Sequence, residues 1–196
     1  MPKAKAQAKT FLIRQCLGSA VSGNEDEMSE HLLLVASFGG VRNVLQTWGA
    51  GERGETGQGY LGDAWTARTV RQLLGTAPLD VAFGYHHALC LSYTQDVYSW
   101  GEGNWGALGR VFPKNVNTRA RDVLLPTPAI IPDLQGYTVV EIAAGGWHSA
   151  ARLGNGNVLT WGWNSHGQLG HGGFETEWVP RIVHELVSRS PQMIAL

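Results

Sequence analysis

Residues 161–170 read W-G-W-N-S-H-G-Q-L-G, and they contain a pattern, W-G-x4-G-x2-G, that occurs three times in the chain. The copies occupy residues 48–57, 100–109 and 161–170, so that their starts lie 52 and 61 residues apart. A period of this length is typical of propellers and solenoids, in which a single unit cannot bury its apolar face alone. The pattern therefore predicts stacked copies of one small unit.

The copies agree beyond the tryptophan and the glycines. A histidine, His87 or His148, stands 13 residues before the second and the third motif tryptophan, whereas position 35, before the first, is valine. Further upstream, Gly75 aligns with Gly136 when both segments are counted back from the histidine. We expect the repeated residues to be structural. They are Trp48, Gly49, Gly54, Gly57, His87, Trp100, Gly101, Gly106, Gly109, His148, Trp161, Gly162, Gly167 and Gly170.

The segments between the motifs indicate short strands. Residues 139–144 include a β-branched run, Asn155-Gly156 supplies a hairpin turn, and residues 158–161 complete a second strand. No helical period is sustained over a dozen residues. We therefore predict an all-β fold, a partial β-propeller built from short antiparallel four-stranded blades. We expect each motif tryptophan to pack between neighbouring units, with its indole N–H bonded to a carbonyl oxygen.

The repeats resemble those of the regulator of chromosome condensation family, whose blades read as a strand, G-x-x-H, a hairpin and W-G-x-N-x-x-G-Q-L-G. The third copy fits that motif at every defining position. The second copy has Gly103 for the asparagine and Ala107 for the glutamine, and the first has Thr56 where leucine is expected. The resemblance covers residues 31–196. It does not distinguish the chromatin-linked members of the family from the ubiquitin-ligase-linked ones.

The resemblance implies a ring of seven blades, which needs about twice the length of this chain. We expect residues 1–30 to be a poorly ordered segment, first basic and then acidic, and residues 31–196 to hold three repeats with a truncated fourth from about residue 178. An open array leaves two sheet edges exposed. Three interpretations stay open here: a fragment of a longer protein, which we favour, a half that assembles with another chain, and a short solenoid with modified ends.

Charge is unevenly distributed along the chain, although its formal net charge is only −1. Residues 1–24 carry Lys3, Lys5, Lys9 and Arg14 and no acidic residue. The simplest interpretation is a solvated start of the chain. A basic arm that contacts DNA phosphates and an organelle-targeting segment are the alternatives. Since the net charge provides no global field for nucleic acid, direct nucleic-acid binding is indicated by this tail alone.

The two cysteines, Cys16 and Cys90, lie far apart in the sequence. This usage indicates a reducing compartment, the cytoplasm or the nucleus, and no disulfide framework. Because Cys90 stands between two leucines, we expect it to be a small core residue. No apolar run approaches the roughly 20 residues that span a bilayer, so we predict no membrane insertion.

The spacing between motif and histidine is longest after the second motif. Gly57 and His87 lie 30 residues apart, whereas Gly109 and His148 lie 39 residues apart, and the nine extra residues fall within residues 110–122. Insertions in repeat proteins map to loops on one face, often the binding face. We therefore take this basic loop as the candidate partner-binding site, with a solvated loop as the alternative. Its cations are Arg110, Lys114, Arg119 and Arg121.

The sequence carries no recognisable catalytic constellation. His87 and His148 recur with the repeat, so we expect core residues that bond a neighbouring strand's carbonyl and not metal ligands. Ser149 follows His148 but lies in no nucleophile elbow. No phosphate-binding loop of the G-x4-G-K-[ST] type is present. We predict that the protein is not an enzyme and that it has no catalytic residue, no cofactor and no metal.

These features predict a protein–protein interaction module, a scaffold or regulator that presents loops to a protein partner. The resemblance implies an alternative, guanine-nucleotide exchange on a Ran-like small GTPase, and partners such as small GTPases or chromatin components. The resemblance also implies a third function, ultraviolet-B photoreception, because the plant photoreceptor of this family holds tryptophan clusters through a G-W-R-H-T motif. The corresponding residues here, 146–149, lack the arginine, which disfavours photoreception.

Overall fold

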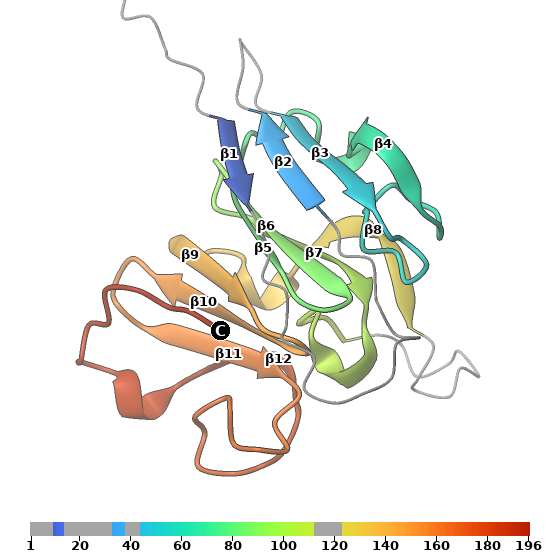
Figure 1. The fold of residues 1–196 in the computed structure, drawn as a ribbon. Helices are drawn as coiled ribbons and strands as arrows, with labels where there is room; N and C mark the ends of the chain where they lie inside the picture. The colour runs from blue at the N-terminus through green and yellow to red at the C-terminus, as the bar shows by residue number, and fades with distance from the viewer. Residues whose placement is uncertain (1–9, 14–32, 38–43, 112–122) are drawn as a thin grey trace, which may run out of the picture.

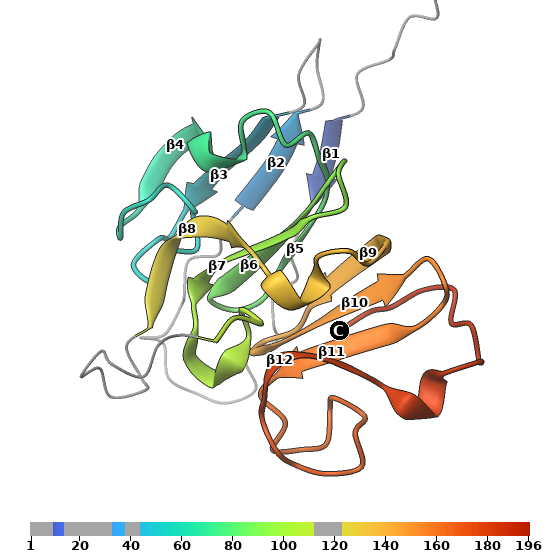
Figure 2. The ribbon, with the colours of Figure 1, turned by 180° about the vertical axis from the view of Figure 1, so that it is seen from behind.

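The chain folds into three four-stranded antiparallel sheets, the blades of a partial propeller (Figure 1, and from behind in Figure 2). The structure is a computed structural model that describes residues 10–13, 33–37, 44–111 and 123–196. Each sheet is a meander, in which every strand pairs with the next in sequence.

The strands of blade 1 are β1 (Thr10–Ile13), β2 (Leu33–Ser37), β3 (Val44–Gly49) and β4 (Ala64–Thr69). Blade 2 contains β5 (Pro78–Phe83), β6 (His87–Ser92), β7 (Val97–Glu102) and β8 (Leu124–Ile130), and blade 3 contains β9 (Val139–Ala144), β10 (His148–Leu153), β11 (Val158–Gly162) and β12 (Glu177–Ile182). The described residues also form four short 3-10 helices: η1 (Arg71–Leu73), η2 (Asn104–Gly106), η3 (Pro132–Leu134) and η4 (His184–Leu186).

The blades share one strand register. His87 pairs with Gly101 in blade 2, and His148 pairs with Gly162 in blade 3, so the repeated histidine lies beside the W-G motif on the neighbouring strand. All nine motif glycines have a positive φ, between 64° and 112°. The predicted all-β fold with four-stranded antiparallel blades is confirmed.

The blade boundaries differ from those predicted. Strand β1 lies within residues 1–30, where the sequence predicts no ordered element, and its T-F-L-I segment pairs with β2. The residues from 178 onward form no fourth sheet, because β12 is the outer strand of blade 3 and no strand follows it in residues 183–196, all of which the structure describes. The outer strand of each blade follows the W-G motif in the sequence. Each sheet therefore ends one strand later than the sequence repeat that the motif closes.

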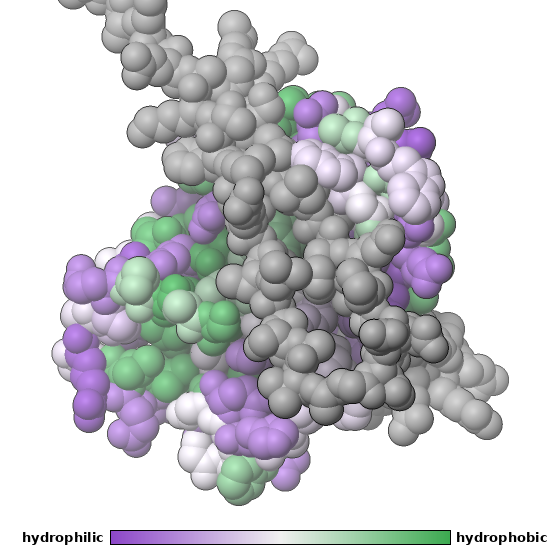
Figure 3. Space-filling view, in the orientation of Figure 1, coloured by the Kyte–Doolittle hydropathy of each residue, from purple (hydrophilic) through white to green (hydrophobic). Residues whose placement is uncertain are grey.

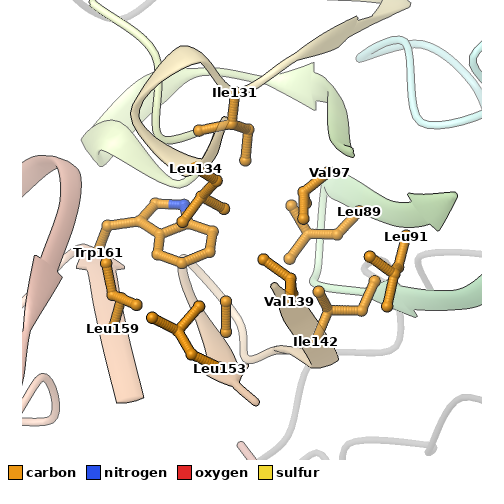
Figure 4. Close-up of a cluster of buried hydrophobic side chains, with 11 residues drawn as sticks. Leu89, Leu91, Val97, Ile131, Leu134, Val139, Ile142, Leu153, Leu159 and Trp161 are labelled. Atoms are coloured by element: carbon orange, nitrogen blue, oxygen red, sulfur yellow. The ribbon is translucent and has the colours of Figure 1, made fainter. Parts of the chain in front are cut away.

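The core consists of apolar side chains that fill the space between consecutive blades. Between blades 2 and 3 lies a cluster of 11 buried residues that includes Leu89, Leu134 and Trp161 (Figure 4). A second cluster, between blades 1 and 2, includes Cys90 and Trp100. Cys90 is fully buried, as predicted. Since both clusters combine side chains of two consecutive blades and of the 3-10 helices between them, much of the hydrophobic stabilisation comes from stacking blade on blade.

The motif tryptophan joins each blade to the preceding one. Trp100 Nε1 donates a hydrogen bond to the backbone oxygen of Glu55 at 2.7 Å, and Trp161 Nε1 donates one to the backbone oxygen of Ala107 at 2.9 Å. Both indoles are completely buried. Each acceptor lies seven residues after the motif tryptophan of the preceding blade. We call this contact the blade joint; the predicted packing of Trp100 and Trp161 is confirmed.

A glycine makes room for each indole of a blade joint. A Cβ built on Gly57 would lie 2.8 Å from Trp100 Nε1, and a Cβ on Gly109 would lie 2.8 Å from Trp161 Nε1. Both glycines also have a left-handed backbone, with φ of +67° and +64°. The last motif glycine is therefore required twice, by its backbone conformation and by the indole that covers it.

A second contact, which was not predicted from the sequence, closes each motif loop within its own blade. A buried threonine or serine precedes every motif tryptophan, and its hydroxyl donates to the backbone oxygen eight residues after that tryptophan. The pairs are Thr47 with Thr56 at 2.6 Å, Ser99 with Leu108 at 2.8 Å, and Thr160 with Leu169 at 2.7 Å. Among the described residues, the Thr56 hydroxyl is buried without a hydrogen-bond partner, in the position that leucine fills in the other copies.

The close approach at Gly109 can be measured by substitution. We expect Gly109→Ala to lower the free energy of unfolding by about 3 kcal/mol, because it combines an unfavourable left-handed backbone with a clash against a buried ring. Gly136→Ala is the matched control: Gly136 has φ +85°, but a Cβ there would meet no atom within 4 Å, so the substitution should cost only about 1 kcal/mol. Urea unfolding followed by tryptophan fluorescence checks both values, and equal losses would contradict the role of the indole.

The unpaired hydroxyl of Thr56 predicts a stabilising substitution. A buried hydroxyl without a partner costs about 1–3 kcal/mol, and valine has nearly the shape of threonine. We expect Thr56→Val to raise the free energy of unfolding by about 1 kcal/mol. Thr47→Val, which removes the donor to the Thr56 carbonyl, should lower it by a similar amount. A loss of stability in Thr56→Val would show that its hydroxyl is satisfied.

Candidate partner-binding face

The long loops gather at one end of the sheets. Because neighbouring strands are antiparallel, the loops after the first and the third strand of a blade lie at the same edge. Backbone hydrogen bonds tie these loops together, from Glu102 N to His86 O at 2.7 Å and from Trp163 N to Trp147 O at 2.9 Å. We call this edge the loop face. Its described loops are residues 50–63 in blade 1, 84–86 and 103–111 in blade 2, and 145–147 and 163–176 in blade 3.

Aromatic side chains form a continuous cluster on the loop face, across the joint between blades 2 and 3. The ring of Trp147 lies 5.1 Å from that of Tyr85 and 5.5 Å from that of Trp163, with edge-to-face geometry in both pairs. Trp163 lies 6.5 Å from Trp105 and 5.1 Å from His166. Such arrangements are attractive. Since Tyr85 is 61% exposed and Trp105 46%, this aromatic cluster presents ring surface to solvent.

The backbone of Trp105 is held in an unfavourable conformation. Its φ is 65° and its ψ 11°, a left-handed conformation that disfavours a residue with a side chain by about 1–2 kcal/mol. Arg53 and His166 occupy the same position in the other two motifs, and neither has a positive φ. Strain of this kind persists where the surrounding structure imposes it and is frequent at functional sites.

At the joint between blades 1 and 2 the loop face is polar. Arg53 Nη1 donates to Glu102 Oε2 at 2.7 Å, and the Glu55 carboxylate lies 3.1 Å from His86 Nδ1. Both carboxylates are nearly buried, and Glu102 also accepts a hydrogen bond from Asn104. Buried carboxylates that are paired and hydrogen-bonded are rigid. The two carboxylates are therefore fixed in place beneath the loop face, and of the Arg53–Glu102 pair only Arg53 is substantially exposed.

The structure gives Arg110, from the predicted binding loop, a structural role. Its guanidinium donates from Nε to Ser99 Oγ and from Nη2 to the Ser99 backbone oxygen, both at 3.0 Å. Gln58 and His171 follow the last glycine of the other motifs, and each contacts the equivalent hydroxyl, at 2.8 and 3.0 Å. Burial lowers the pKa of Arg110 from its usual value. The other cations of that loop, Lys114, Arg119 and Arg121, lie outside the described residues.

The repeated histidine also connects blades. His87 is fully buried, and its Nε2 lies 2.9 Å from Ser149 Oγ in the next blade, while Ser149 donates to the Ala107 backbone oxygen, also at 2.9 Å. We predicted a strand carbonyl as the partner of His87, and this prediction is wrong. The ring contacts a hydroxyl, and that hydroxyl donates to a backbone carbonyl oxygen. Burial, with smaller contributions from His148 and His86, lowers the pKa of His87 to about 3. Burial also lowers the pKa of His148.

Within the described parts of the chain, no group of three or more histidine, cysteine, aspartate or glutamate side chains is placed to hold a metal ion. A helix long and apolar enough to cross a bilayer is likewise missing from those parts.

The sheets and their shared register define a β-propeller built from a repeated four-stranded blade. The chain belongs to the regulator of chromosome condensation (RCC1) repeat family. The family model matches residues 96–152 and 155–196, just over half of the chain, and a second model with the same description matches residues 139–168.

Several known proteins are similar to this chain. The human E3 ubiquitin-protein ligase HERC2 is 34% identical over 116 residues, which cover 59% of this chain and 2% of the ligase. The ultraviolet-B receptor UVR8 of Arabidopsis thaliana is 32% identical over 154 residues, which cover 78% of this chain and 33% of the receptor. The chain therefore spans at most about a third of these two relatives.

Solved structures agree on the fold. Prp20p from Saccharomyces cerevisiae, reported with its binding properties to Gsp1p and histones, matches with a TM-score of 0.63 and 22% identity over 80% of this chain and 37% of Prp20p. Yeast RCC1 (Prp20) bound to Kap60 matches with a TM-score of 0.59 and 25% identity over 93% of this chain and 41% of that chain.

The buried His87 predicts a pH dependence of stability. The unfolded chain takes up a proton near the ordinary pKa of 6.5, whereas folded His87 resists protonation until about 3. The contribution of neutral His87 to the free energy of unfolding is therefore complete above pH 6.5. Between pH 6.5 and about 3 it declines as the pH falls, by about 1.4 kcal/mol per pH unit. Between pH 4.5 and 6.5 the free energy of unfolding of His87→Gln should rise less steeply with pH than that of the wild type. The difference in slope corresponds to one bound proton, about 1.4 kcal/mol per pH unit. Urea unfolding at several pH values checks this, and an unchanged slope would contradict it.

Proposed function

We propose that the chain is a protein–protein interaction module of the RCC1 repeat type, a scaffold or regulator, and that the loop face meets the partner. The aromatic cluster is the observation that carries this proposal. Four rings and a histidine from four separate segments converge across one blade joint, and two of the rings are about half exposed or more. Tryptophan and tyrosine are the residues most enriched among those that dominate binding energy at protein interfaces.

The strain at Trp105 supports the same surface. The Trp105 indole is 46% exposed although its backbone is strained, and a partner that covers the exposed part of the ring would make use of it. Arg53, held by the buried Glu102 at the neighbouring joint, adds an exposed charged group that would select among partners and orient them. The described part of the loop face thus combines an apolar anchor with a polar border, as protein interfaces do.

Nucleotide exchange on a Ran-like small GTPase is the narrower form of this proposal. The fold likeness to Prp20p, which was reported with its binding to Gsp1p, supports testing it. Purified chain should then accelerate release of a fluorescent guanine nucleotide from such a GTPase. An unchanged release rate, measured alongside binding of the same GTPase, would leave the scaffold role and remove exchange.

Substitution of Trp105 separates binding from folding. Trp105→Gly removes the ring and places at φ 65° the residue best suited to it, so relief of the backbone strain offsets part of the packing lost against Trp163 and the variant should stay folded, which urea unfolding checks. If the aromatic cluster anchors the partner, loss of this ring should weaken binding about 30-fold, the equivalent of about 2 kcal/mol. Biolayer interferometry against a Ran-like GTPase and against histones measures the change.

The matched control is Tyr93→Ala. Tyr93 is 73% exposed, but it follows β6 and so lies at the opposite edge of the sheets. Its loss should leave binding unchanged. Equal binding by the wild type, Trp105→Gly and Trp147→Ala would show that the partner does not use the aromatic cluster.

A further inference from the structure

We propose that Asn155 is a site of spontaneous covalent modification, at which the side-chain amide is lost as ammonia and isoaspartate is formed. The site lies in the turn between β10 and β11 of blade 3. This inference is independent of the loop face and its partner. The turn follows the second strand of its blade, so it lies at the opposite edge of the sheets.

The sequence places the reaction at one pair of residues. Asn155-Gly156 is the only Asn-Gly pair in the chain. Asparagine is a thermally labile residue, because the backbone nitrogen of the next residue can attack its Cγ, and glycine leaves that approach open since it has no side chain. Asn155 is exposed. In the view of Figure 1 the turn lies at the left end of blade 3, where Figure 3 shows mostly hydrophilic residues at the margin.

The turn holds the side chain in a reactive arrangement. The backbone N–H of Asn157 donates to Asn155 Oδ1 at 3.0 Å, which folds the side chain forward along the peptide of Gly156. Negative charge develops on this same Oδ1 when Cγ is attacked, so a donor already stands where it stabilises the charge. One contact opposes the reaction, since Gly156 N donates to Leu153 O at 2.9 Å and that bond has to open first.

The reaction needs only water. The nitrogen of Gly156 forms a bond to Asn155 Cγ and releases its proton to water. The bond from Cγ to Nδ2 then breaks, and the nitrogen leaves as ammonia with a proton taken from water. Water opens the resulting five-membered imide at either carbonyl. Attack at the backbone carbonyl leaves the peptide link through Cγ, which is isoaspartate, and attack at Cγ leaves aspartate.

The fold protects the asparagine that offers the best comparison, Asn164. It too precedes a small residue, Ser165, but it is 1% exposed. Its Nδ2 donates to the backbone oxygens of Gly173 and Glu175, both at 3.0 Å, and its Oδ1 accepts from Leu169 N at 2.9 Å. All of these contacts have to break before Cγ can be attacked, so the folded chain should react at Asn155 and spare Asn164.

The product alters the centre of blade 3. Isoaspartate adds one main-chain carbon between residues 155 and 156, inside the turn that the bonds from Gly156 N to Leu153 O and from Leu153 N to Asn157 O close. Both bonds span the inserted carbon. Since β10 and β11 are the two middle strands of the blade, the modified chain should unfold at a lower urea concentration than the unmodified chain. The modification also adds one negative charge to this edge.

Mass spectrometry of the aged chain tests the proposal. The folded protein is kept at neutral pH and digested after arginine, which releases residues 153–181 as one peptide that carries Asn155, Asn157 and Asn164. Fragmentation locates the gain in mass, and a protein isoaspartate methyltransferase with labelled S-adenosylmethionine detects isoaspartate in that peptide. Asn155 should convert at least about tenfold faster than Asn164, since each broken contact adds to the barrier. In concentrated urea the two rates should approach each other.

Two variants of the turn are the matched controls. Asn155→Gln should abolish methyl labelling of the peptide, because its longer side chain would need a larger ring. Asn157→Gln keeps the backbone donor to Asn155 and should label like the wild type. Cooperative urea unfolding shows that both are folded, and Asn155→Ser replaces Asn155→Gln if that variant unfolds. Equal conversion of Asn155 and Asn164 in the folded chain, or labelling of the peptide that survives loss of Asn155, would overturn the proposal.

Discussion

The indole-to-carbonyl hydrogen bond between blades is the contact on which this fold depends. One motif supplies both sides of it: the tryptophan donates to the blade before, and the loop that follows accepts from the blade after. The acceptor oxygen and the glycine under the indole lie seven and nine residues after the tryptophan. An insertion inside the motif would therefore displace both from the incoming ring, which explains why all three copies keep the same length.

Around this constant contact the side chains vary freely. The residue after the last motif glycine is glutamine, arginine or histidine, and all three reach the hydroxyl before the tryptophan. The same two motif positions hold the ion pair of Arg53 and Glu102 in the first joint and the ring pair of Trp105 and Trp163 in the second. Backbone geometry fixes the joint, so chemistry at its rim can change without loss of the fold. The proposed partner binding is accordingly placed at the rim.

Features that recur along the chain are predictable from its sequence, whereas contacts between residues that meet only in space are not. The motif spacing predicted the blades and the buried indoles because both follow from local periodicity, and the place of Cys90 between two leucines predicted its core position. The partner of His87 lies 62 residues away in the next blade, and no local signal points to a serine hydroxyl. The aromatic cluster has the same origin, since Tyr85, Trp105 and Trp147 come from separate loops. The hydroxyl before each tryptophan did recur and was a readable signal.

The distribution of chemistry over the loop face favours a macromolecular partner over a small ligand. Carboxylates held by Arg53 and His86 lie at one joint, and the aromatic cluster lies at the next. A small molecule would contact one of these surfaces, whereas a protein surface of ordinary interface size would span both. The carboxylates are already satisfied within the chain, so they contribute orientation and selectivity more than affinity. The rings lack that internal satisfaction, and the binding energy is expected to concentrate on them.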